Sequence, residues 1–96
     1  MRYVVNGQDL YEDTEPMLEE EFSTAFDAVE WASVFWRDMA REHEGEPVAF
    51  AYAEVADSLE IRAVGIDIGE ARPRDDVDGL VVEAGGYKMW FSGQDD

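Results

Sequence analysis

Acidic side chains dominate the first third of this sequence, with no base to balance them. No lysine or arginine lies between Arg2 and Arg37, and a second stretch without either runs from Arg41 to Arg62. Over the whole chain, 24 aspartates and glutamates stand against seven lysines and arginines, a formal net charge of −17. A charge of about 2–8 suffices for solubility in a small domain, and self-repulsion beyond it destabilises the compact state. The fold must therefore tolerate a strong negative field, and we expect a basic partner to compensate for it.

The rest of the composition is that of a small folded domain. We predict one domain over residues 1–96, because 46% of the residues are hydrophobic and five Phe, four Tyr and three Trp supply a core. The chain has no cysteine, which excludes disulfides and thiolate metal sites. No signal peptide and no apolar run of ~20 residues, the length of a membrane span, is visible in the sequence. We therefore expect a cytoplasmic protein.

One segment has the periodicity of a long amphipathic helix. Thr24 is suited to cap its N-terminus, and Asp27 stands three residues later at capping-box spacing. The helix is predicted over about 24–43, because Gly45 and Pro47 follow and stop it. The apolar residues that share its predicted core face are Phe22, Ala25, Phe26, Val29, Ala32, Phe35, Trp36 and Met39.

Strand signals stand before this helix. Asn6-Gly7 is typical of a type I′ turn and predicts a short hairpin between residues 2–5 and 8–11. Residues 12–22 form an acidic lead-in to the helix, and from Pro16 onward this segment is equally compatible with a strand. The positive end of the helix dipole makes the crowding of Glu19–Glu21 tolerable.

Strand signals also follow the helix. Large and small residues alternate from Val48 to Val55, and Asp57-Ser58 can turn the chain into a second strand in which Gly65 marks a bulge. Gly85-Gly86 predicts a last hairpin, before a frayed tail over 92–96. The prediction is an α+β domain, with one long amphipathic helix packed on a mostly antiparallel sheet of hairpins whose later strands span about 48–91.

No residue pattern for catalysis, metal binding or cofactor binding stands out. His43 is the single histidine and lies at a helix end, which makes a zinc site implausible. The run from Asp76 to Gly79 is similar to the centre of a calcium loop, but Arg74 and Gly85 occupy positions that need oxygen ligands. We therefore expect no enzymatic activity, no metal and no cofactor.

Charge is then the feature that a function has to explain. Like charge repels nucleic acids and anionic membranes, so neither is an expected ligand. Proteins that hold duplex DNA line their clefts with Lys and Arg, and a compact acidic domain can occupy such a cleft in place of DNA. We predict a small acidic inhibitor that acts by DNA mimicry on a basic protein or nucleoprotein complex, such as a nuclease, a CRISPR effector or a DNA-binding protein.

This profile of small size, strong acidity and near absence of lysine resembles that of the small phage-encoded inhibitors of restriction or CRISPR complexes. The resemblance implies an anti-restriction or anti-CRISPR role in the cytoplasm of a bacterial host. The candidate contacts with the partner are Glu12, Asp13, Glu15, Glu19, Glu20, Glu21, Asp27, Glu30 and Trp31.

Trp31 allows two interpretations, because it falls within the polar arc of the predicted helix. It is either covered by a flanking segment or serves as an aromatic anchor for the partner.

Three alternatives to mimicry are also open. They are a non-enzymatic acidic adaptor or subunit that binds a protein by shape, a small domain adapted to high salt, and a fold in which divalent cations neutralise the acidic clusters.

Overall fold

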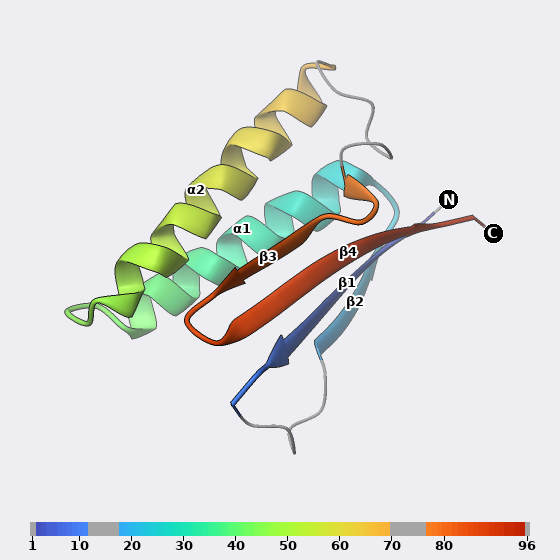
Figure 1. Ribbon diagram of the computed structural model, residues 1–96. Helices are drawn as coiled ribbons and strands as arrows, with labels where there is room; N and C mark the ends of the chain where they lie inside the picture. Colours follow the sequence, from blue (N-terminus) through green and yellow to red (C-terminus); the bar gives the residue numbers. More distant parts are fainter. Residues whose placement is uncertain (1, 12–17, 70–76, 96) are drawn as a thin grey trace.

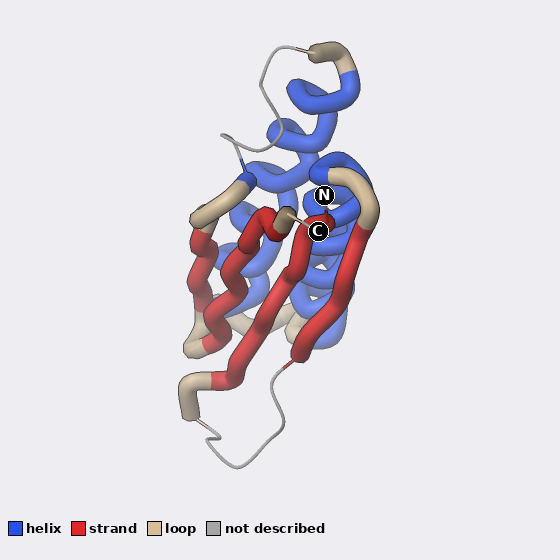
Figure 2. The backbone as a smooth tube through the Cα atoms, turned by 90° about the vertical axis from the view of Figure 1, so that its right-hand side faces the viewer, coloured by secondary structure: helices blue, strands red, loops and turns tan. Residues whose placement is uncertain are grey.

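The computed structural model describes residues 2–11, 18–69 and 77–95 and has an α+β fold. Within these residues, two helices and four strands follow one another as β1 (Arg2–Asp9), β2 (Leu18–Phe22), α1 (Ala25–Glu42), α2 (Val48–Asp67), β3 (Val81–Ala84) and β4 (Tyr87–Gln94). The strands form one antiparallel sheet in the order β2-β1-β4-β3. Both helices lie on the same side of this sheet (Figures 1 and 2).

The first strand passes straight through Asn6-Gly7, so the hairpin turn predicted there is wrong. Gly7 pairs with Leu18 of β2 on one side and with Met89 of β4 on the other. A Cβ atom at Gly7 would lie 2.6 Å from the Tyr87 hydroxyl oxygen. The glycine is therefore needed for the close approach of a ring rather than for a turn.

The single predicted helix is present as α1 and begins where its cap indicated. The Asp27 amide donates a hydrogen bond of 3.1 Å to Oγ1 of Thr24, the N-cap residue. After the helix, the chain turns at Gly45, whose φ is +92°, a value that favours glycine.

The two strands predicted between Val48 and Ile68 are wrong, because residues 48–67 form the second helix, α2. Its buried residues are Tyr52, Ala56, Leu59 and Ala63, a spacing of three and four that matches a helical period. Pro47 begins this helix as its N-cap with φ −56°, instead of only ending the helix before it. The described residues consequently contain two long helices where the sequence predicted one.

The last predicted hairpin is confirmed as β3 and β4. Gly85 and Gly86 have positive φ values of 59° and 82°, as a type I′ turn requires. The frayed tail predicted over 92–96 is wrong for its first residues, because β4 continues to Gln94 and pairs there with Arg2. In the acidic lead-in, Leu18–Phe22 is the strand β2, and the rest of it from residue 12 to 17 lies outside the described residues.

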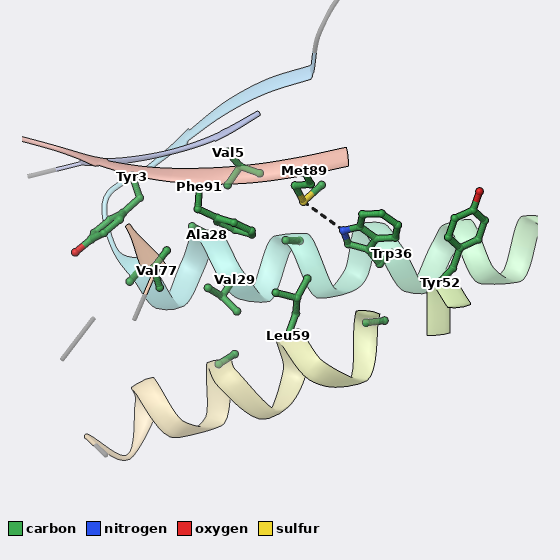
Figure 3. Close-up of a cluster of buried hydrophobic side chains, with 14 residues drawn as sticks. Tyr3, Val5, Ala28, Val29, Trp36, Tyr52, Leu59, Val77, Met89 and Phe91 are labelled. Carbon is green, nitrogen blue, oxygen red and sulfur yellow. Dashed lines mark hydrogen bonds between the residues drawn. The ribbon is translucent and has the colours of Figure 1, made fainter. Parts of the chain in front are cut away.

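The core lies between the sheet and the helix pair (Figure 3). Trp36 of α1 is fully buried, and its Nε1 donates a hydrogen bond of 3.3 Å to Sδ of Met89 on β4. Leu59 belongs to the same cluster and enters it from α2. α1 is therefore packed on two sides, against the sheet and against α2. This arrangement determines which side of each helix faces solvent.

Candidate partner-binding surfaces

Three of the candidate glutamates lie on an edge strand of the sheet. β2 is an outer strand in the sheet order, and Glu19, Glu20 and Glu21 are all exposed on it. Glu20 stands opposite the core residue Val5, whereas its two neighbours are turned to the sheet face away from the helices. The strand thus presents carboxylates on both sides of its edge.

Two further candidates lie on the first turns of α1. Asp27 and Glu30 are exposed, and their spacing of three residues places them on neighbouring positions of the helix surface. Asp27 lies in the first turn, where the positive end of the helix dipole favours a carboxylate. Since only Ser23 and Thr24 separate β2 from α1, we treat the five acids Glu19, Glu20, Glu21, Asp27 and Glu30 as one region, the acidic β2–α1 surface.

Trp31 is half-buried and has a structural contact. Its ring lies 5.6 Å from that of Phe22, at the end of β2, and 5.6 Å from that of Phe35. The interpretation that a flanking segment covers Trp31 fits this packing, and its use as an anchor for a partner remains a prediction. The other candidates, Glu12, Asp13 and Glu15, lie outside the described residues.

Several basic side chains pair with acids of the same molecule. Arg2 Nη1 lies 3.0 Å from Glu21 Oε1, and both side chains are about half exposed. Arg37 Nη2 bridges α1 to α2, at 2.8 Å from Asp57 Oδ1 and 2.6 Å from Glu60 Oε2. The hydrogen bond to Asp57 and the charges of both acids raise the pKa of Arg37. Within the acidic β2–α1 surface, Glu21 is thus partly neutralised by Arg2.

The sequence prediction missed an apolar surface on α2. Phe50, Ile61, Val64 and Ile68 are exposed by 78%, 74%, 56% and 63%. We call these four residues the α2 ridge. The signal that could have revealed them is their helical spacing, which the prediction of strands from residue 48 concealed.

In residues 2–11, 18–69 and 77–95, no group of three or more His, Cys, Asp or Glu is arranged to hold a metal ion. The His43 Nδ1 atom contacts Glu46 Oε2 at 3.0 Å, at the turn between the two helices. Neither α1 nor α2 is long and apolar enough to span a membrane.

Comparison with protein-family models, with curated proteins and with solved structures gives no match for this chain. Its function therefore has to be inferred from its own surfaces.

Proposed function

We propose that this protein is a small acidic inhibitor that occupies the nucleic-acid-binding cleft of a basic protein or nucleoprotein complex by mimicking DNA. The observation that carries the proposal is the spacing of carboxylates on β2. Consecutive residues of an antiparallel strand are ~3.4 Å apart, and one strand of duplex DNA carries one phosphate per ~3.4 Å of helix axis. Glu19, Glu20 and Glu21 follow one another at that backbone spacing along an exposed edge, with Glu20 on the opposite face from its neighbours and Glu21 partly neutralised by Arg2.

The start of α1 extends this charged edge. Asp27 and Glu30 add two exposed carboxylates separated by ~4.5 Å of helix axis. The net charge of −17 adds long-range steering, which accelerates encounter with a basic cleft and repels nucleic acid from the same site. An anti-restriction or anti-CRISPR role is the form of this function that the small size and the acidity favour.

The test separates a specific surface from overall charge. One variant reverses Glu19, Glu20, Asp27 and Glu30 to Lys, and a matched control reverses Asp38, Glu42, Glu83 and Asp95, which are exposed away from β2, from the start of α1 and from the α2 ridge. Each reversal changes the charge by two, so both variants go from −17 to −9. Circular dichroism verifies that both variants are folded.

The tagged proteins are used to capture partners from native host lysate, which are eluted first with duplex DNA, then with salt, and identified by mass spectrometry. We expect the wild type and the control to retain a basic nucleic-acid-binding protein that DNA displaces, and the β2–α1 variant to lose it. A retained partner that DNA does not displace, or equal retention by both variants, would overturn the proposal.

A second candidate function is an adaptor that binds a partner by shape. The observation that favours it is the α2 ridge, which exposes large apolar side chains on a surface that is otherwise strongly charged.

A further inference from the structure

α2 is apolar on two opposite sides. One side, with Tyr52, Ala56, Leu59 and Ala63, is buried against α1 and the sheet. At 100° per residue, the α2 ridge falls on the other side. Large apolar side chains that are exposed together on one side of a helix are typical of an interface, so the ridge has the composition of one.

The ridge has the spacing that a partner helix requires. Ile61, Val64 and Ile68 are three and four residues apart, and the same series continued backwards passes through Asp57 and Glu54 before it reaches Phe50. This is the alternation of three and four that places side chains along one seam between two helices. From residue 50 to residue 68 the seam is ~27 Å long.

Two hollows flank this seam and give it depth. A hollow of about 460 Å³ is lined by Ile61, Val64, Gly65 and Ile68 with two acids, and Gly65 has no atom within 4 Å of its missing Cβ. A second hollow of about 760 Å³ lies between the end of α1 and the start of α2, where Phe50 lines it together with three alanines and Pro47. Side chains of an incoming helix can enter both hollows.

The charge around the seam selects the occupant. The two hollows and the helix surface beside them carry six carboxylates, those of Glu44, Glu46, Glu54, Asp57, Glu60 and Asp67. Arg37 neutralises part of this charge by pairing with Asp57 and Glu60, and Arg41 is paired with Asp38, so the rim remains negative. A second copy would bring an equally acidic rim against this one, whereas a helix with basic flanks complements it.

We infer that the outer side of α2 binds an amphipathic helix of a partner protein, with apolar residues spaced by three and four and with Lys and Arg on both flanks. This inference goes beyond the proposed function and does not depend on it. β2 and β3 are opposite edges of the sheet, α2 contacts β3, and α1 contacts β2 (Figure 1). The α2 ridge and the acidic β2–α1 surface are therefore separate and can be occupied together.

The probe is a synthetic helical peptide of about 20 residues with Leu at seam spacing and Lys on the flanks, a length that matches the ~27 Å seam. Two matched peptides carry Glu in place of Lys, or the same residues in scrambled order. The protein variants are Ile61→Ser/Val64→Ser and the control Val81→Ser, a residue that is 52% exposed on β3. Binding is measured by calorimetry on the full chain, and circular dichroism verifies folding.

We expect the Lys peptide to bind with a micromolar Kd, the double variant to weaken this binding at least tenfold, and the control to leave it unchanged. The Glu peptide should not bind. Equal binding of the scrambled peptide would overturn the inference, because it would show attraction by charge alone. Equal binding by the double variant would overturn it too, as would a wild-type dimer in analytical ultracentrifugation that the double variant abolishes, since the occupant would then be a second copy.

Discussion

Substituting Gly65 by alanine is predicted to stabilise the protein. Gly65 lies inside α2 with a negative φ, two residues before the helix ends at Asp67. A Cβ atom at this position meets no atom within 4 Å, so the added methyl group causes no clash. Alanine is more favourable than glycine inside a helix by about 0.5–1 kcal/mol. For a domain of this size, Tm should rise by about 2–8 °C.

Thermal and urea unfolding followed by far-UV circular dichroism measure this difference. The control is Gly85→Ala, because Gly85 has φ +59° and its Cβ would lie 2.5 Å from Cγ2 of Val48 and 2.6 Å from the hydroxyl oxygen of Tyr52. The control should lose more than about 1 kcal/mol of stability. A loss of stability in Gly65→Ala would refute the reasoning, because it is the result expected if Gly65 occupied a bulge with positive φ in a strand.

Three further predictions concern the core, the pH dependence and the salt dependence. Leu59→Ala removes a side chain that is 1% exposed and should cost about 2–5 kcal/mol in urea unfolding, whereas a loss below about 1 kcal/mol would contradict the described core. Burial, assisted by the charges of Asp9 and Glu46, raises the pKa of Tyr52. The unfolded phenol ionises near pH 10 and the folded one at higher pH, so this contribution to stability is complete below about pH 10 and is lost above it. In urea unfolding above about pH 10, the free energy of unfolding of Tyr52→Phe should therefore fall less with pH than that of the wild type. Raising NaCl from ~0.05 to ~0.5 M should increase Tm, because it screens the repulsion among the excess carboxylates, and a chain that folds only in molar KCl would instead indicate adaptation to high salt.

The sequence predicted the elements whose signals are local. Thr24 and Asp27 identify the start of α1 because the cap is a contact between residues three positions apart. Gly85 and Gly86 identify the last hairpin because a type I′ turn needs positive φ at both positions. In these cases the deciding interaction lies within a few residues of the pattern.

The second helix was missed because a pattern of period two competed with helix propensity. Val48, Phe50 and Tyr52 alternate with alanines, and this alternation indicated a strand. In the structure Tyr52 is buried whereas Phe50 is exposed, so the three large residues do not share one face. Alanine has the highest helix propensity, and the alanines of this segment correctly indicate a helix.

The position of the candidate site depended on contacts between distant residues. Asn6-Gly7 satisfies the rule for a hairpin turn, but Gly7 is constrained by Tyr87, which lies 80 positions further along the chain. The three glutamates of β2 were recognised as charges, yet their place on a sheet edge follows from the pairing of Tyr3 with Phe22 and of Gly7 with Leu18. No local signal predicts which strand of a sheet lies at its edge.

The two proposed surfaces differ in the force that they use, and salt separates them. Binding at the acidic β2–α1 surface depends on charge, so a partner held there should dissociate as the ionic strength rises. Binding at the α2 ridge depends mainly on the burial of Ile61, Val64 and their neighbours, and burial of apolar area persists in salt. A partner that remains bound at high salt and is released by Ile61→Ser/Val64→Ser belongs to the ridge. One that duplex DNA displaces and that the Glu19, Glu20, Asp27 and Glu30 reversal abolishes belongs to the acidic surface, so the same capture experiment assigns each partner to one side of the molecule.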